Sequence, residues 1–195
     1  MEYNVKRGEI KIDKELNNLD KFVLDFVSVL KNYVIVSGYV SIILGRSRAT
    51  EDVDLLIPPM KKIEFNTFWK KVIEKGFWCI NTPDSEEAFD MLSQNAIRFA
   101  KNKNPIPNIE FKFIKNEIDK FSYKNKIKVL IGSTSFFVSP LELQIAYKLF
   151  LGSNKDIEDA RHIYGLFREK INKDELTDSL NKLGVYKKRK FLEDE

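Results

Sequence analysis

The sequence predicts an α+β protein, in which a mixed β-sheet flanked by helices is followed by a C-terminal helical region. Short runs of β-forming residues alternate with amphipathic helical segments over the first part of the chain. Beyond the last of these runs, only helical patterns follow. Because no low-complexity linker interrupts the chain, we expect residues 1–135 to form an α/β core with an N-terminal helix. Residues 136–195 are expected to form a helical region packed on that core.

The elements of the core are marked by the spacing of apolar residues. Spacings of three and four mark helices, whereas dense or alternating apolar runs mark strands. Helices are predicted at residues 13–32, 39–44 and 60–75, and strands at 33–36, 52–57, 96–100, 109–114, 126–130 and 135–138. Residues 81–94 indicate a loop or a short helix, and residues 101–108 indicate a turn-rich connector.

The helical region begins with a clear start signal. Ser139-Pro-Leu-Glu142 has the spacing of a capping box with proline at the first helical position. A helix is therefore predicted from this segment to Leu151, before Gly152. Two further helices are predicted at residues 154–170 and 173–183.

The charge and the rare residues limit the class of protein. The chain has 33 Lys and Arg against 29 Asp and Glu, and its net charge of +4 permits a polyanionic partner without requiring one. A single cysteine, Cys79, excludes an internal disulfide, and a single histidine, His162, disfavours a zinc site. The N-terminus does not resemble a signal peptide and no apolar run is long enough to span a bilayer, so we expect a cytoplasmic protein without membrane contact.

Asp52 and Asp54 are the first candidate site residues. In a strand, residues two apart point to the same face and lie about 6.6 Å apart along the chain. Val53, Leu55 and Ile57 then point to the other face and anchor the strand in a core. Two carboxylates on one face repel unless a cation lies between them, and hard oxygen ligands suit Mg²⁺. The pair predicts a divalent-metal site, and the alternative is the polar edge of an ordinary strand.

The segment before the aspartates has the form of a phosphate-binding turn. The run Tyr33-Val-Ile-Val36 leads into Ser37-Gly38 and then into a short predicted helix. N–H groups at a helix N-terminus carry partial positive charge, and Gly38 allows a close approach of the backbone to a phosphate. The alternative is an N-cap serine followed by a turn glycine.

Two further residues complete the candidate site. Glu110 and Lys112 alternate with apolar residues in the strand at 109–114, so Glu110 joins the aspartates if the two strands are neighbours. A third carboxylate can complete a metal site or act as general base; the alternative is a solvated edge. Lys148 lies in a helix that is apolar nearly all round, where it needs an anionic partner such as a triphosphate, or reaches to solvent.

Taken in order, these features resemble the signature of the nucleotidyltransferase superfamily with the DNA polymerase β-like fold, and more closely its AbiEii-type toxin branch. That branch has a strand, a Gly-Gly or Gly-Ser pair, a small helix, a Gly-x-x-Arg-x-Thr segment and Asp-hydrophobic-Asp. The matching positions are Ser37, Gly38, Gly45, Arg48, Thr50, Asp52 and Asp54. Three downstream segments also resemble the branch pattern, which has Ser-Pro-Glu-x-Leu, then a Lys, then Lys-Asp-x-x-Asp. In the same order, this chain has Ser139-Pro-Leu-Glu142, Lys148 and Lys155-Asp-Ile-Glu-Asp159. The resemblance covers roughly residues 33–167.

The resemblance implies a nucleotidyltransferase-like sheet, a bound Mg²⁺ or Mn²⁺ ion and a nucleoside triphosphate as substrate. It implies that the catalytic and metal-binding residues are Asp52, Asp54 and Glu110, and that the triphosphate is bound by Ser37, Gly38, Arg48, Thr50 and Lys148. Asp156 and Asp159 then orient Lys148 or Arg48, or cap their helix; we favour the structural role for Asp156 and leave Asp159 open.

The resemblance also implies transfer of a nucleoside monophosphate to a hydroxyl of RNA, such as a tRNA 3′ end, or of protein. A toxin role with a cognate antitoxin is part of the same implication. The basic run Lys187-Lys-Arg-Lys190 fits contact with an RNA backbone, or a solvated tail beside Glu193-Asp-Glu195. The alternative function is a catalytically weak or inactive protein of this fold that binds a nucleotide or a partner protein.

Overall fold

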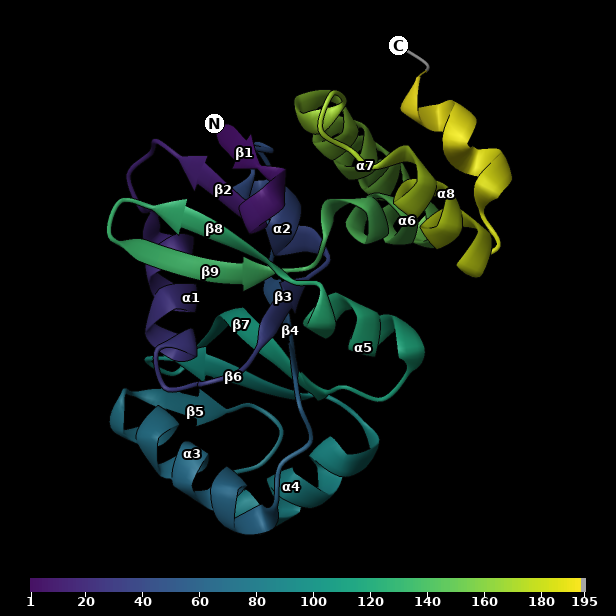
Figure 1. The fold of residues 1–195 in the computed structure, drawn as a ribbon. Helices are drawn as coiled ribbons and strands as arrows, with labels where there is room; N and C mark the ends of the chain where they lie inside the picture. Colours follow the sequence, from purple (N-terminus) through teal and green to yellow (C-terminus); the bar gives the residue numbers. More distant parts are fainter. Residues whose placement is uncertain (194–195) are drawn as a thin grey trace.

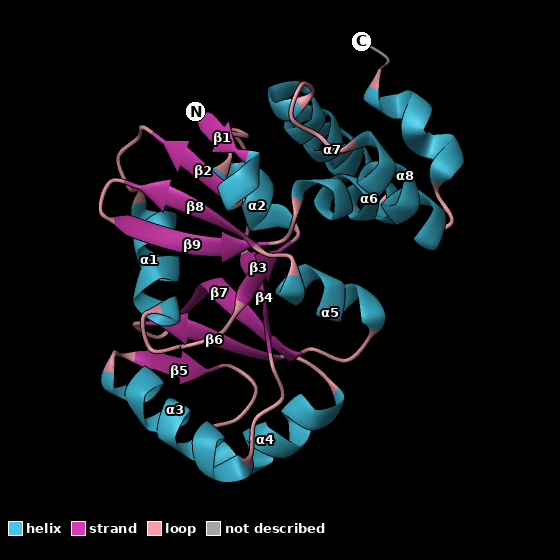
Figure 2. Ribbon diagram, viewed as in Figure 1, coloured by secondary structure: helices cyan, strands magenta, loops and turns pink. Residues whose placement is uncertain are grey.

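Within residues 1–193, which the computed structural model describes, nine strands form one mixed sheet in the order β1-β2-β8-β9-β3-β4-β7-β6-β5 (Figures 1 and 2). Asp194 and Glu195, the last residues of the predicted acidic end, lie outside this range. The strands are β1 (Glu2–Asn4), β2 (Glu9–Ile12), β3 (Val34–Val36), β4 (Asp52–Ile57), β5 (Phe77–Cys79), β6 (Ile97–Lys101), β7 (Asn104–Phe113), β8 (Ile127–Ile131) and β9 (Thr134–Val138).

Helices lie on both faces of this sheet, and a further group of helices follows its last strand, β9. The α-helices are α1 (Asn18–Val27), α2 (Gly38–Ile43), α3 (Lys62–Glu74), α4 (Ser85–Gln94), α5 (Glu117–Lys124), α6 (Leu141–Leu151), α7 (Asn154–Phe167) and α8 (Lys173–Lys182), and the 3₁₀ helices are η1 (Val5–Arg7) and η2 (Tyr186–Leu192). Figure 1 shows α6, α7 and α8 as one group that follows the end of β9. No helix among residues 1–193 combines the length and the apolar character that crossing a membrane requires.

An aromatic core holds α1 and α3 against one face of the sheet. The Phe26 ring of α1 lies 5.9 Å from Phe68 of α3, 5.4 Å from Phe99 of β6 and 5.9 Å from Phe111 of β7, centroid to centroid. Phe68 stacks on Phe111 at 4.8 Å. Burial of such large rings is the main favourable contribution to folding. This core fixes the position of β7, the strand that carries Glu110.

The opposite face of the sheet is covered by α5 and bordered by α6. Tyr123 of α5 packs near a small apolar cluster formed by Val34, Leu56 and Ile114. β4 therefore has apolar neighbours on both faces after Asp54, which explains why its second half reads Leu-Leu-Ile without alternation. Only its first half, which carries the aspartates, is left for polar chemistry.

Most predicted elements are confirmed, with shifted ends. The predicted strand at 52–57 coincides with β4, and residues 85–94 within the predicted loop or short helix form α4. Most of the predicted connector at 101–108 is instead strand, with the turn confined to Asn102 and Lys103 between β6 and β7. Residues 104–107 form part of β7 although they include two prolines, because β4 begins to pair with β7 only at Asn108.

The predicted capping box at the start of α6 is wrong. Pro140 is the N-cap and makes no side-chain capping bond, so the helix begins at Leu141. The Ser139 hydroxyl donates to Gln144 at 2.9 Å, and Glu142 accepts from the Asn172 N–H at 2.9 Å. Both side chains have tertiary partners that compete with the local cap. The expected division at residue 135 falls inside β9, which still belongs to the sheet.

Several elements lacked a sequence signal. The strands β1 and β2 have only three and four residues, too few for a clear pattern, and lie at one edge, where β2 pairs in parallel with β8. β5 is a three-residue strand at the opposite edge. Such short edge strands depend on a neighbour in the sheet rather than on their own propensity.

Candidate active site

Asp54 and Glu110 are brought side by side by two parallel strands. β4 and β7 pair with Asp54 opposite Glu110 and with Asp52 opposite Asn108. Because paired residues of neighbouring strands point to the same face, both carboxylates face away from the aromatic core. The expectation that the strand of Glu110 is adjacent to that of the aspartates is confirmed.

Lys112 links these two carboxylates. Its Nζ lies 2.7 Å from Asp54 Oδ1 and 2.9 Å from Glu110 Oε2. On the other side, Arg98 of β6 donates from Nη2 to Glu110 Oε1 at 3.2 Å. The cluster thus combines two carboxylates with two cations, and its formal charge is zero when all four groups are ionised.

The two carboxyl groups respond differently to this environment. Burial raises the pKa of Asp54 above its ordinary value, and the attraction of Lys112 offsets only part of that effect. Burial acts in the same direction on Glu110, but its hydrogen bonds with Lys112 and Asp54, together with the charges of Lys112 and Arg98, hold its pKa below the ordinary value. Burial lowers the pKa of Lys112, and the two carboxylates raise it by more. Of the two carboxyl groups, Asp54 is therefore the one whose pKa is raised and Glu110 the one whose pKa is lowered.

Asp52 lies at the exposed start of β4. The Thr50 hydroxyl donates to the Asp52 carbonyl oxygen at 3.0 Å and lies 3.4 Å from the Asp52 carboxylate. Asp52 and Asp54 present hard oxygen donors from one face of the strand, and this chemistry fits Mg²⁺ or Mn²⁺. Across residues 1–193, no three Asp, Glu, His or Cys side chains are grouped tightly enough to hold a metal. Glu110 is instead paired with Lys112 and Arg98.

The turn before α2 is tied to α6. Ser37 has φ 61° and ψ −129°, a conformation that glycine adopts far more readily than serine. The Ser37 N–H donates to Gln144 Oε1 at 3.1 Å, and Gln144 Nε2 donates to the Ser37 carbonyl oxygen at 2.6 Å. Ser139 donates to the same Oε1 at 2.9 Å. The Ser37 N–H therefore already has a partner on α6.

Gly38 is the contact point of Arg48. A Cβ atom at this position would lie 2.7 Å from Arg48 Nη2, so any side chain here would displace the guanidinium. The close approach expected at this glycine therefore exists, and the group that makes it is Arg48. This places a guanidinium over the start of α2, beside Ser37.

Arg48 and Lys148 share a buried carboxylate. Arg48 donates from Nε and Nη2 to the two oxygens of Asp159 at 3.0 and 2.8 Å. Lys148 lies 2.8 Å from Asp156 and 3.0 Å from Asp159, and the side chains of Lys148 and Asp159 are 2% and 0% exposed. Burial raises the pKa of Asp156, but hydrogen bonds from Lys148 and Ser153 hold it below the ordinary value. The anionic partner expected for Lys148 is thus supplied by α7, and Asp159 orients both cations.

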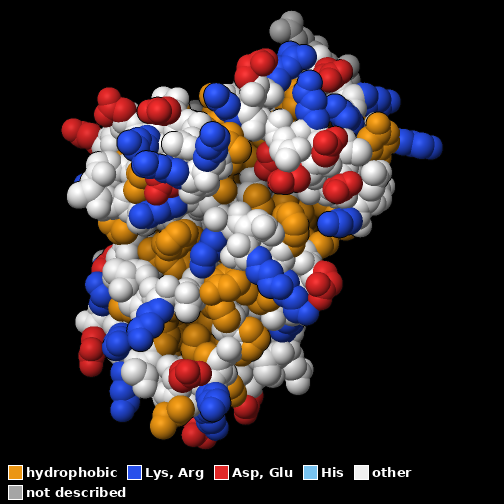
Figure 3. Space-filling view, viewed as in Figure 1, with side chains coloured by type: hydrophobic (Ala, Val, Ile, Leu, Met, Phe, Trp, Pro, Cys, Tyr) orange, Lys and Arg blue, Asp and Glu red, His pale blue; other side chains and the backbone are white. Residues whose placement is uncertain are grey.

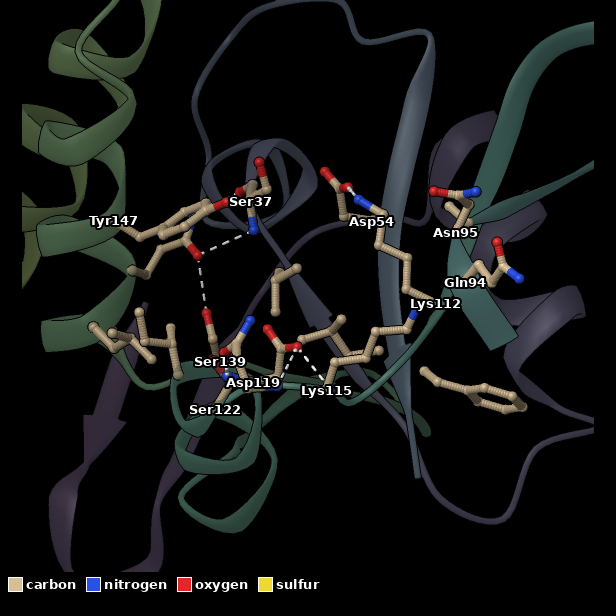
Figure 4. Close-up of a pocket in the computed structure, with 18 residues that line it drawn as sticks. Ser37, Asp54, Gln94, Asn95, Lys112, Lys115, Asp119, Ser122, Ser139 and Tyr147 are labelled. Atoms are coloured by element: carbon tan, nitrogen blue, oxygen red, sulfur yellow. Dashed lines mark hydrogen bonds and ion pairs between the residues drawn. The ribbon is translucent and has the colours of Figure 1, made fainter. Parts of the chain in front are cut away.

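A pocket of about 350 Å³ adjoins this site, on the face of the sheet covered by α5 (Figure 4). Its polar wall includes Ser37, Asp54 and Lys112, and Tyr147 of α6 borders it. Seen from the side of Figure 1, hydrophobic side chains gather across the middle of the molecule with lysine and arginine side chains among them (Figure 3). The volume and the mixed lining suit a ligand with an apolar ring and a charged group.

The predicted site residues are divided among different surroundings. Ser37 and Asp54 line the pocket of Figure 4, whereas Arg48 and Thr50 line a second, more open pocket with Lys101 and Asn102. Asp52, Glu110 and Lys148 line neither pocket. The structure thus joins Asp54 to Glu110, and Arg48 to Lys148, in two separate ion-pair clusters.

Three residues of the site were missed by sequence reasoning. Lys112 was expected on the same face as Glu110, but spacing along one strand does not show that its side chain reaches Asp54 on another. Gln144 and Tyr147 lie in a helix whose apolar residues gave the stronger signal. Asp54 and Tyr147 both line the pocket, so β4 and α6 share this site. Burial raises the pKa of the Tyr147 hydroxyl, and the charge of Asp54 adds to the shift.

Comparison with known proteins supports the architecture. No model of a protein family matches the chain, and no curated protein matches it. A nucleotidyltransferase-like antigenic protein from Paracoccidioides brasiliensis matches with a TM-score of 0.56 and 17% identity, over 91% of this chain and 92% of that one. The chain has a nucleotidyltransferase-like fold. The protein JHP933 from Helicobacter pylori matches with a TM-score of 0.46 and 14% identity, over 90% of each chain.

Both strands that carry the candidate carboxylates, β4 and β7, belong to the sheet of this nucleotidyltransferase-like fold. The match to the Paracoccidioides protein extends over most of both chains, so it includes the helical region as well as the sheet. At this identity the likeness defines the fold alone.

Proposed function

We propose that the protein is a nucleotidyltransferase that moves a nucleoside monophosphate from a nucleoside triphosphate to an acceptor hydroxyl, with Mg²⁺ or Mn²⁺ as cofactor. The observation that carries the proposal is the register of β4 and β7, which pairs Asp54 with Glu110. Asp54 in turn lines a pocket of nucleoside size. The nucleotidyltransferase-like fold supports the same assignment.

The proposed reaction is an in-line displacement. The acceptor oxygen forms a bond to the α-phosphorus while the bond from that phosphorus to the β-bridging oxygen breaks, and pyrophosphate leaves with that oxygen. The acceptor proton passes to a carboxylate, for which Glu110 is the candidate. A divalent ion held by Asp52 and Asp54 would neutralise charge on the phosphates.

The remaining residues position the substrate and neutralise its charge. Ser37 and Lys112 face the pocket from two sides, so a triphosphate beside Asp54 meets a hydroxyl and an ammonium group. Arg48 lies over Gly38, and Thr50 fixes the turn before Asp52. Lys148 reaches a phosphate only through a rearrangement of its pairs with Asp156 and Asp159. Positioning and charge neutralisation of this kind supply most of the acceleration in phosphoryl-group transfer.

The acceptor is proposed to be a hydroxyl of RNA, such as a tRNA 3′ end, or of a protein. Part of the basic run at residues 187–190 has a structural partner, because Lys188 donates to the Leu149 carbonyl oxygen at 2.8 Å and so caps the end of α6. Arg189 also has a partner, because its Nη1 lies 3.4 Å from the Thr177 hydroxyl oxygen, so Lys187 and Lys190 are the cations of this run proposed to contact an RNA backbone. The proposal extends to a toxin with a cognate antitoxin, on the basis of the sequence resemblance.

The test is a labelling experiment. The protein is incubated with Mg²⁺, each labelled nucleoside triphosphate, total tRNA and cell lysate, and the labelled product is separated by size and by nuclease or protease sensitivity. We expect labelling by the wild type, at least about 100-fold less labelling by Asp52→Ala and by Asp54→Ala, and full labelling by Asp178→Ala, which alters an exposed carboxylate of α8. Equal, blank reactions for all four chains would contradict catalysis.

The second candidate function is nucleotide or protein binding without turnover. It is favoured by one observation, namely that Lys112 and Arg98 already neutralise the carboxylates. Calorimetry that detects nucleotide binding without any labelled product supports this candidate. Growth arrest on expression of the wild type, absent with Asp54→Ala and relieved by the neighbouring gene product, supports the toxin role; unaffected growth contradicts it.

A further inference from the structure

Lys112 has a position that the proposed reaction leaves unexplained. Its ammonium group lies within hydrogen-bond distance of both Asp54 and Glu110. These two carboxylates are neighbours on the same face of the sheet, because β4 and β7 pair with Asp54 opposite Glu110. Figure 4 shows its side chain extended along the pocket toward Asp54. A divalent ion bound to these same oxygens would have to occupy the place where the ammonium group now lies.

The charges of the cluster oppose the joint presence of Lys112 and a metal. Lys112 and Arg98 already balance Asp54 and Glu110, so a divalent ion would add two positive charges within a few ångströms, of which the Asp52 carboxylate offsets only one. At such separations the repulsion between an ammonium group and a dication is substantial even at the higher effective dielectric of a protein surface. Metal binding is therefore coupled to the departure of Lys112.

The side chain of Lys112 has room to depart. It is 34% exposed, in contrast to the fully enclosed Lys148. It lines the pocket beside Ser37 and Asp54, where the phosphates of the proposed substrate would lie. A lysine stem is flexible and its ammonium is a compact point charge, so the same group can serve a carboxylate in one state and a phosphate in another.

We infer that Lys112 is a resident cation of the carboxylate centre, which competes with a divalent metal for Asp54 and Glu110 and transfers to the phosphates when metal and nucleotide arrive together. This inference rests on the proposed function. It makes metal binding weak in the absence of nucleotide and ties formation of the metal-loaded centre to the substrate. Lys112 thus regulates metal binding at the site to which it belongs.

The experiment measures binding of Mn²⁺ alone to the full chain by electron paramagnetic resonance of the free ion. Lys112→Met and Lys112→Gln remove the charge, and Gln keeps a hydrogen-bond donor for the carboxylates. We expect both variants to bind Mn²⁺ about tenfold more tightly than the wild type, or more. Lys112→Arg keeps the charge and is expected to bind as weakly as the wild type.

Lys115→Met is the matched control. Lys115 is an exposed lysine that also lines the pocket; its backbone N–H donates to Asp119, but among residues 1–193 its ammonium group forms no ion pair. We expect its removal to leave Mn²⁺ affinity unchanged, because it does not occupy the metal position. Thermal unfolding of each variant checks that the compared chains are folded.

Inorganic triphosphate without metal tests the second half of the inference. If Lys112 transfers to the phosphates, Lys112→Met lowers the affinity for this probe by about tenfold, and Lys112→Arg retains it. A variant that binds both Mn²⁺ and triphosphate like the wild type overturns the role of Lys112, while labelling by the wild type would still uphold the proposed function. Absence of Mn²⁺ binding in every chain, with and without nucleotide, overturns both.

Discussion

The ion pairs around Asp159 give the sharpest prediction about stability. Asp159 of α7 is fully buried and accepts from Arg48, in the loop before β4, and from Lys148 of α6. Asp159→Ala removes the carboxylate that joins these three segments and leaves Arg48 and Lys148 with too little negative charge; it also removes a carboxylate oxygen that lies 3.7 Å from Arg46 Nε. Lys148 keeps only Asp156, at 2.8 Å.

The magnitude follows from the burial of the groups left behind. Loss of one partner from a buried ion pair costs about 3–5 kcal/mol, since the remaining charge is desolvated without compensation. Each kcal/mol lowers the melting temperature by about 2–4 °C in a chain of this size. We therefore expect Asp159→Ala to melt about 6–20 °C below the wild type.

The assay is thermal and urea-induced unfolding followed by circular dichroism. Glu158→Gln is the matched control, because the adjacent Glu158 side chain is 56% exposed and pairs with Arg46 at the surface. Exposed ion pairs of this kind contribute about 0–1 kcal/mol. Lys148→Met combined with Asp159→Ala should recover part of the loss, since the buried cation is then removed together with its partner.

A melting temperature for Asp159→Ala within about 2 °C of the Glu158→Gln value would refute this reasoning. It would mean that Arg48 and Lys148 find solvent or other anions at little cost. In that case the two cations would be free to bind a phosphate without structural loss, and the expectation that they bind the triphosphate would gain support.

Two further changes test local features. Ser37→Gly should stabilise the protein by about 1 kcal/mol in urea unfolding, because glycine adopts the positive φ of this turn without strain; equal or lower stability would show that the Ser37 side chain stabilises the turn by more than the strain costs. Burial raises the pKa of Glu142, so the contribution of this group to stability is fully present below the ordinary pKa of glutamate and is lost as the pH rises through the raised value. Glu142→Gln should therefore melt above the wild type near pH 7, with the difference vanishing toward pH 4; a difference independent of pH would contradict this.

Much of the site was predictable because it lies on regular elements. Alternation along residues 52–57 places Asp52 and Asp54 opposite Val53 and Leu55, and β4 has this arrangement. The isolation of Lys148 in an apolar helix predicted an anionic partner. In each case a local pattern of period two or 3.6 determines which way a side chain faces, so no knowledge of the neighbours is needed.

Such local patterns could not predict contacts between side chains that lie far apart in the sequence. The capping box at Ser139 fails because Gln144 and Asn172 offer the same side chains better-placed partners. Lys112 could be placed on a face but not beside Asp54, since that contact depends on the register of two strands and joins residues 58 positions apart in the sequence.

The sequence alone determined the α+β class, the acidic face of β4 and the order of motifs that resembles nucleotidyltransferases, because these depend on short-range periodicity and on residue identity. Tertiary structure alone decided which charges meet. It paired Lys112 with Asp54 and Glu110, and Arg48 and Lys148 with Asp159. Ion pairs act through space, and the same lysine is a metal competitor or a solvated charge according to which strand the fold places beside it.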